Sequence, residues 1–376
     1  MTLHDRLADF RAFASMIIIL TFINIWQTWN LFMSDRDLIR ITETLSLANI
    51  PAYNAAIKLG VIWYYKKDLQ PIVQSLYDDW YAPKTNEERT TMMNSARFSK
   101  RLSFWCIVLS LIMLTTYVSL RSFKIVKYDV NAMSQDRLAI YPAYYPFDLR
   151  RTSVRVVANV AQVIAAYCGA LPYSGVDTFI ATLVMHACGQ FKNLCRKLER
   201  LMDETSKKRK SSEIQQELAW IIKRHEHLNW IGNKIGEYFS ILLFLQMLLS
   251  TVEICFQGFS FFNVILKDEN GLLTFQMFFF VLYVSFVIVH MFVYCYVGDL
   301  LLVQSSSLGM SAYKSRWYNV APSDARCLLF IMLRSTRPLC LTAGKFGIFS
   351  MEMFSSILRT AMGYLSVLLT VSSGDN

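Results

Sequence analysis

The chain has 376 residues, of which 54% are hydrophobic and only 18% are charged, and it carries 26 Phe and 19 Tyr. A soluble domain usually holds about 25% charged residues, so this composition excludes an ordinary soluble protein and indicates one polytopic membrane protein. The formal net charge is +10, but Lys and Arg lie between apolar stretches rather than in one basic patch. This distribution favours membrane topology over nucleic-acid binding, and we expect no nucleic-acid partner.

Seven apolar stretches are long enough to cross a bilayer, since a helical span needs about 20 mostly apolar residues. The first follows a charged N-terminal segment that lacks an Ala-x-Ala-like cleavage site, so we expect it to remain as a signal anchor. The predicted spans are 12–33, 41–65, 101–124, 153–190, 235–266, 272–300 and 345–371. The fourth and fifth are expected to continue as helix beyond the membrane. Residues 325–341 are too few and too charged to cross, and predict a cytoplasmic or re-entrant helix.

The distribution of positive charge predicts the orientation of these spans. Segments 1–11, 66–101, 191–234 and 301–345 share one side and hold 26 of the 38 Lys and Arg residues. The positive-inside rule places that side in the cytoplasm, with the N-terminus inside and the C-terminus outside. Residues 121–155 run against this bias, because seven cations fall on the predicted outer side. The expected fold class is an all-α polytopic membrane protein with seven transmembrane helices and a cytoplasmic helical anchor region.

The sequence lacks the motifs that are typical of several classes of protein. The predicted orientation is opposite to that of a G-protein-coupled receptor, and the Asp-Arg-Tyr and Asn-Pro-x-x-Tyr motifs of that class are missing. We find no internal repeat of the kind that marks many transporters. No phosphate-binding loop or hydrolase motif occurs, so we expect neither an enzyme nor a cofactor. His225 and His227 are two residues apart and do not face each other on a helix, so no metal site is expected.

The segment between the fourth and fifth predicted spans carries apolar residues at helical spacing on both sides of Lys207–Lys210. This pattern predicts two amphipathic cytoplasmic helices joined by a turn. Their apolar faces are compatible with solvated helices or with a packing surface for oligomerisation.

The last predicted span contains residues that lipid disfavours. On a helical period, Glu352, Ser356, Arg359 with Thr360, Gly363, Val367 and Thr370 form one stripe. Polar and ionisable groups in membrane helices face a bundle interior or a water-filled cavity. Periodicity alone leaves both interpretations open: the stripe packs against other helices of the same chain, or it lines a pore in which Val367 forms a hydrophobic constriction.

The C-terminal part of the chain resembles the signature of insect odorant receptors. The resemblance rests on Ala312-Tyr313, Trp317-Tyr318, residues 331–334 (IMLR), Pro338-Leu339, residues 341–346 (LTAGKF) and the closing helix 354–364. Residues 141–148 (YPAYYPFD) also resemble a loop motif of that family.

This resemblance implies an odorant-gated, non-selective cation channel with four subunits around one pore, in the plasma membrane of a sensory-neuron dendrite. The short segment between spans four and five implies an odour-tuned subunit that assembles with the family's co-receptor as a heterotetramer. Residues 1–300 then form six transmembrane helices with the ligand pocket, and residues 301–376 form the anchor helix and pore helix. Signalling through a G protein and membrane transport are the alternatives.

The resemblance also implies site residues. Val367 corresponds to the hydrophobic gate of the pore, and Thr370, Val371, Gly363 and Glu352 lie on the same helix. The odour pocket of the family lies in the outer half of spans two, three, four and six, and its ligands are small apolar or aromatic volatiles, with membrane lipid around the bundle. The corresponding candidates in this chain are Tyr53, Leu114, Tyr117, Val157, Ala161, Ile164, Phe279 and Tyr283.

Overall fold

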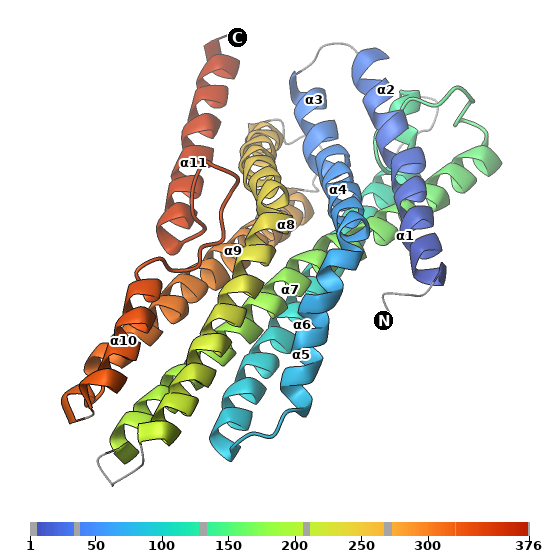
Figure 1. Cartoon of the computed structure of the whole chain (residues 1–376). Coiled ribbons are helices and arrows are strands. Elements are labelled where there is room, and N and C mark those ends of the chain that lie inside the picture. The colour runs from blue at the N-terminus through green and yellow to red at the C-terminus, as the bar shows by residue number, and fades with distance from the viewer. Residues whose placement is uncertain are drawn as a thin grey trace.

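The computed structural model describes residues 6–33, 38–127, 134–205, 211–266, 273–319 and 321–374. These residues form a bundle of long helices (Figure 1), in agreement with the predicted all-α class. The C-terminal end of α11 lies at the opposite end of the bundle from α10, and we call the end that holds α10 the anchor end.

The first two membrane helices are each interrupted by one π-helical turn. The first consists of α1 (Arg6–Ile19), the π turn η1 (Leu20–Asn24) and α2 (Ile25–Met33). The second consists of α3 (Leu38–Thr44), η2 (Leu45–Asn49) and α4 (Ile50–Tyr64). After a bend at Tyr65 the chain continues as α5 (Lys66–Tyr81). A π turn shifts the hydrogen-bond register by one residue and often occurs at functional sites.

Four much longer helices follow: α6 (Asn86–Lys127), α7 (Thr152–Thr205), α8 (Ser211–Leu266) and α9 (Leu273–Lys314). At about 1.5 Å per residue, helices of 42 to 56 residues are at least twice as long as the bilayer's hydrocarbon core of about 30 Å. The predicted extension of the fourth and fifth spans is therefore present. α6 and α9 extend in the same way, and α9 passes unbroken through position 300. The turn predicted at Lys207–Lys210 lies outside the described residues.

The C-terminal segment returns along the bundle. A short 3₁₀ turn at Trp317–Asn319 precedes α10 (Pro322–Ser335). Another 3₁₀ turn, Gln135–Leu138, lies between α6 and α7. A tight hairpin then joins α10 to α11 (Met351–Gly374), with hydrogen bonds from Ala343 N to Gly347 O (2.8 Å) and from Phe349 N to Leu341 O (2.8 Å). Gly344 adopts φ +57° at the turn, a conformation that favours glycine. Residues 341–346, singled out in the sequence, are thus the turn that leads into the last helix.

Within the described ranges, six helices are long and apolar enough to cross a membrane. The segment formed by α3, η2 and α4 overlaps the predicted span 41–65 but is not among these six.

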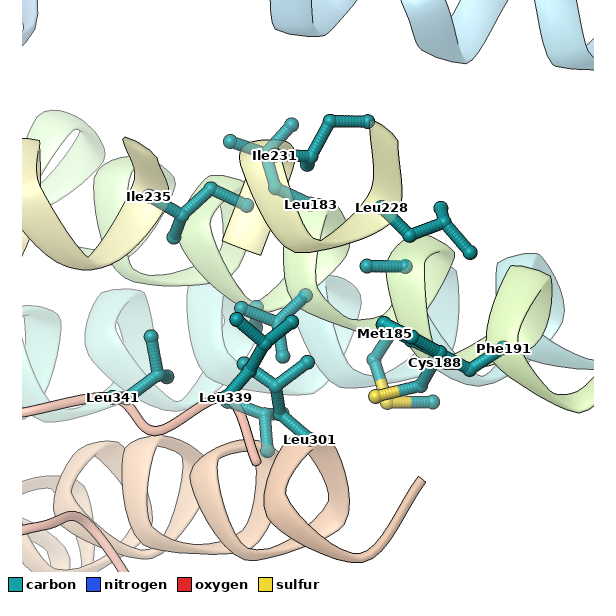
Figure 2. Packing of buried hydrophobic residues seen from close by; sticks show 14 of the residues in the cluster. Leu183, Met185, Cys188, Phe191, Leu228, Ile231, Ile235, Leu301, Leu339 and Leu341 are labelled. Atoms are coloured by element: carbon teal, nitrogen blue, oxygen red, sulfur yellow. The ribbon is translucent and has the colours of Figure 1, made fainter. Parts of the chain in front are cut away.

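The largest hydrophobic core fills the anchor end. Leu183 to Phe191 of α7, Leu228 to Ile235 of α8 and Leu301 of α9 meet Leu339 and Leu341, which lie on the chain after α10 (Figure 2). The apolar faces of the predicted amphipathic helices also belong to this core, including the buried Leu198 and Leu218. These faces are therefore covered within one subunit, and they are neither solvated nor available to a second copy.

A charged cluster ties α5 to the long helices. The Asp79 carboxylate accepts hydrogen bonds from His186 Nε2 of α7 (2.9 Å) and from Arg224 Nη2 of α8 (2.6 Å). Burial disfavours the charged form of Asp79, but the hydrogen bond from His186 and the charge of Arg224 outweigh it. The pKa of Asp79 therefore lies below its usual value.

We expect Asp79→Asn to lower the free energy of unfolding by about 1–3 kcal/mol at neutral pH, because it removes the charge that both partners bind. Since the folded-state pKa is depressed, this stabilisation is fully present above the ordinary aspartate pKa of about 3.9. It is lost as the pH falls through the lower folded-state pKa. Thermal unfolding of the detergent-solubilised protein at several pH values measures both effects.

The matched control is Asp78→Asn, because Asp78 is exposed and accepts a hydrogen bond from Gln74 of its own helix. An equal loss of stability in the two variants would contradict a specific role for Asp79 in holding α5.

Candidate functional site

A predominantly apolar cavity lies between η1, η2 with α4, α6, α7 and α9. Its wall includes Ile23 and Leu47 from the two π turns and Phe286 from α9. The space open to the centres of water-sized molecules is about 70 Å³. A single water needs about 10–15 Å³ by this measure, so the cavity holds several waters or one small organic molecule. Such an apolar site with few polar groups is typical of small-molecule pockets.

The structure brings four of the eight predicted pocket residues to this cavity. Leu114 and Tyr117 of α6 and Phe279 and Tyr283 of α9 line its wall. All four are buried in the second hydrophobic core of the chain.

The other four predicted residues are absent from the lining of this cavity. The exposed fractions of Val157 and Ile164 are 70% and 53%, and Ala161 is partly buried elsewhere on α7. The Tyr53 hydroxyl pairs with Thr28 Oγ1 of α2 at an exposed position (3.3 Å). The sequence predicted which helices surround the pocket and how deep in the membrane its residues lie. It did not predict which face of each helix points into the cavity. The residues of α7 that do line the cavity are Ala166, Gly169, Ala170 and Tyr173.

The cavity wall includes part of a loop that the long helices hold in place. Tyr117 OH and Arg121 Nε donate to the carbonyl oxygen of Ile140 at 3.1 and 3.0 Å. Gln162 of α7 accepts from Tyr141 N and donates to Tyr141 O, both at 3.0 Å. Arg155 likewise donates to Leu149 O (3.4 Å). These contacts explain part of the excess of cations on the predicted outer side, because Arg121 and Arg155 bind loop carbonyls.

The two π turns lie against each other at the cavity. Asn24 Nδ2 of η1 donates to Asn49 O of η2 at 3.1 Å. Tyr283 OH donates to Ser46 O, and Ser46 Oγ donates to Gln257 Oε1 of α8 at 3.3 Å. Buried backbone carbonyls need partners, and here side chains from neighbouring helices provide them. The sequence prediction missed these turns, although the polar residues Asn24, Ser46 and Asn49 within apolar spans were a signal.

A buried ion pair lies next to the cavity. Lys58 Nζ of α4 is 2.6 Å from Asp177 Oδ1 of α7, and both side chains are inaccessible to solvent. The same ammonium lies 3.5 Å from the ring centroid of Tyr173, which lines the cavity. Tyr294 OH of α9 donates to the Asp177 carboxylate. Ionisable residues within membrane spans are costly and are usually paired and functional. The sequence prediction located Lys58 within a span but did not identify its partner.

A second polar row connects the ion pair to α8. Asn54 Nδ2 donates to Gln246 Oε1 at 2.7 Å, and Gln246 Nε2 donates to Tyr173 OH at 2.9 Å. Two turns further along α8, Glu253 is fully buried, and neither of its carboxylate oxygens has a hydrogen-bond partner in the described part of the chain. One face of α8 therefore presents polar groups to the cavity wall.

The polar stripe of α11 faces away from its own subunit, unlike the polar face of α8. Ile357 and Ala361 are buried against the bundle, whereas Glu352, Gly363, Val367 and Thr370 are exposed. A Cβ added at Gly363 would meet no atom within 4 Å. The side chain of Val371 lies outside the described ones. Of the two interpretations that the sequence left open, packing of the stripe against helices of the same chain is therefore wrong.

Four glycines of α8 and α9 each lie very close to the C-terminal segment. We call these four contacts the glycine seam. A Cβ at Gly298 would lie 2.6 Å from the carbonyl oxygen of Phe349, and one at Gly258 would lie 2.8 Å from Leu365 of α11. Small residues allow membrane helices to approach each other closely. The other two contacts pair Gly232 with Leu339 and Gly309 with Ser335.

The chain resembles known proteins in sequence and in fold. The family model described as 7tm Odorant receptor matches residues 41–362. Odorant receptor 85c of Drosophila melanogaster is 24% identical over 84% of this chain and 78% of its own length. Odorant receptor 10a of the same species is 22% identical over 88% of this chain and 82% of its own length. The match to Odorant receptor 13a of that species, at 24% identity, covers 64% of this chain and only 60% of the relative.

The fold resembles that of a solved insect receptor. The olfactory receptor OR5 from Machilis hrabei, in complex with eugenol, superposes with a TM-score of 0.80 over 95% of this chain and 88% of the other, at 15% identity. The Odorant receptor coreceptor of Aedes aegypti is 22% identical over 42% of this chain and 31% of its own length. The matched family is one of receptors, not of enzymes.

The buried ion pair yields a test by a double-mutant cycle. Lys58→Met leaves the Asp177 carboxylate buried without its cation, and Asp177→Asn leaves the ammonium without its anion. We expect each single variant to lose about 3–5 kcal/mol of unfolding free energy, and the double variant to lose much less than the sum. Thermal unfolding of the solubilised protein measures the coupling. Additive losses would contradict a direct interaction.

Proposed function

Because the chain belongs to the 7tm Odorant receptor family, we propose that it is a subunit of a non-selective cation channel that a small volatile opens. The observation that carries this proposal is the polar face of α11. The described chain leaves Glu352 and Thr370 exposed on a helix long enough to span a membrane. Lipid disfavours such a face, whereas a water-filled pore between subunits accommodates it.

In the proposed assembly, four subunits place α11 around one central pore. Val367 forms the hydrophobic gate near the outer end, with Thr370 and Val371 next to it and Gly363 and Glu352 further inside. The N-terminus and the anchor end lie in the cytoplasm, and the C-terminus lies outside. The long ends of α7, α8 and α9 with α10 then form the cytoplasmic anchor.

The proposed ligand is a small apolar or aromatic volatile bound in the cavity. Leu114, Tyr117, Phe279 and Tyr283 supply apolar and aromatic surface there. The volume of the cavity limits the ligand to a small molecule. Support by analogy comes from the structurally similar receptor of Machilis hrabei, which was solved with eugenol.

Helix α8 is the proposed connection between cavity and pore. Its Gln246 bonds to the cavity residue Tyr173, and its Gln257 bonds to Ser46 beside the cavity. The next residue, Gly258, packs on Leu365 of α11. A ligand that binds the open state more tightly shifts the population towards it, and a displacement of α8 would transmit that preference to α11.

The proposed partner is the odorant co-receptor, with which the chain forms a heterotetramer in the plasma membrane of a sensory-neuron dendrite. The partial match to an Odorant receptor coreceptor supports common ancestry of the two subunits. An odour-tuned role is supported by the short segment between the fourth and fifth predicted spans, which holds only about forty residues.

Electrical recording tests the channel. In cells that co-express this chain with an odorant co-receptor, a panel of volatiles should evoke a cation current that persists in excised patches without GTP. A current that requires GTP would favour a receptor acting through a G protein. Steady uptake of the volatile without unitary conductance would favour a transporter.

The face of α11 is tested by a matched pair of substitutions. Val367 and Met362 are equally exposed in the isolated subunit, at 59% and 60%, but lie on different sides of the helix. Val367→Ala should increase the basal current several-fold, because a smaller side chain weakens a hydrophobic constriction. Met362→Ala should leave it near the wild-type value. Equal basal currents in the two variants would contradict the proposed orientation of the pore helix.

A further inference from the structure

Five of the described residues that line the cavity carry a hydroxyl group, and four of these hydroxyl groups have hydrogen-bond partners. Tyr117 donates to Ile140 O, and Tyr283 donates to Ser46 O. The other two are Ser110, which donates to Cys106 O, and Tyr173, which accepts from Gln246. The fifth residue is Tyr141, and within the described residues its hydrogen bonds run through its backbone and none to its hydroxyl is present.

The side chain of Tyr141 is fixed in place although its hydroxyl has no partner. Gln162 binds both the backbone N–H and the carbonyl of Tyr141. The ring stacks on that of Tyr117, with centroids 5.0 Å apart and an interplanar angle of 27°. Only 3% of the residue is exposed. A phenol in this position is pre-organised, because little side-chain freedom remains to be lost when a ligand binds.

A hydroxyl group at an apolar cavity has a specific consequence for recognition. A buried polar group without a hydrogen bond is unfavourable, so a ligand that supplies a partner gains more than one that does not. The phenol O–H is a donor, and it can donate to an acceptor oxygen on the ligand. The acceptor oxygen of the ligand loses its hydrogen bonds to water when it enters the apolar cavity, so it needs a donor there.

We propose that Tyr141 is the polar anchor of the ligand, and that it selects volatiles with a hydrogen-bond acceptor, such as a ketone or aldehyde, over hydrocarbons of the same shape. This inference rests on the proposed function, since it assigns the chemical class of the channel's ligand. It also adds Tyr141 of the loop to the recognition residues contributed by the helices.

Pairs of isosteric volatiles test this assignment. In each pair a methylene group replaces the carbonyl oxygen: acetophenone is paired with α-methylstyrene, and benzaldehyde with styrene. In cells that express the wild-type chain with the co-receptor, the carbonyl compounds should activate at concentrations about 2–10-fold lower than their alkene partners, as one hydrogen bond implies. This comparison needs no variant and therefore does not depend on how a substitution folds.

Tyr141→Phe removes only the hydroxyl and keeps the ring on Tyr117. It should abolish the preference for the carbonyl compounds, so that each carbonyl compound and its alkene partner activate at similar concentrations. The matched control is Tyr167→Phe, because the Tyr167 hydroxyl pairs with Thr115 Oγ1 and does not line the cavity. An epitope tag on the chain verifies that both variants reach the cell surface in wild-type amounts.

The outcomes separate this inference from the proposed function. Equal potency of carbonyl and alkene in the wild type, a preference that survives in Tyr141→Phe, or a channel opened by other volatiles but by no carbonyl compound would overturn the role of Tyr141. Absence of any odour-evoked current with a surface-expressed chain would instead overturn the proposed function.

Discussion

The ion pair between Lys58 and Asp177 is the constraint around which the rest of the bundle is arranged. A buried charge without a partner is costly, so α4 and α7 have to meet where these two side chains touch. Tyr294 adds α9 through its bond to Asp177, and the Asn54–Gln246–Tyr173 row adds α8. Sliding of α4, α7 or α9 would strand a charge of this pair or the hydroxyl that binds it. These three helices therefore share one register, whereas α8 is joined to them by neutral hydrogen bonds of Gln246.

The cavity has its position because of this polar layer. Tyr173 belongs to both, since its ring lies over the Lys58 ammonium and also lines the cavity wall. On the remaining sides, the two π turns and the loop held by Arg121 and Gln162 surround the same space. Several groups in this otherwise apolar wall therefore have positions that hydrogen bonds set. Such a wall can discriminate between ligands by shape, because its side chains have few alternative positions.

Apolar content was sufficient to predict the helical class, six of the seven spans and the extension of α7 and α8. The faces of the helices were harder to predict. Val157 and Ile164 were placed in the pocket by depth, but α7 rotates them outward and presents Ala166 and Tyr173 instead. A side chain's direction in a bundle depends on which helix is its neighbour, and one sequence does not contain that information. For the same reason, Lys58 could be recognised as unusual while its partner could not.

The polar stripe of α11 shows the complementary case. Its periodicity was evident in the sequence, but only the packing of Ile357 and Ala361 against the bundle decided which way it faces.

The glycine seam and the cavity wall tolerate substitution very differently. At Gly298 the backbone of the hairpin approaches so closely that even one methyl group would have to displace Phe349 O, whereas at Gly258 it would meet the movable end of the Leu365 side chain. The cavity wall, by contrast, can exchange one apolar side chain for another at a moderate cost in packing. In the proposed receptor, ligand preference can therefore diversify through the cavity while the attachment of α11 to the bundle stays unchanged.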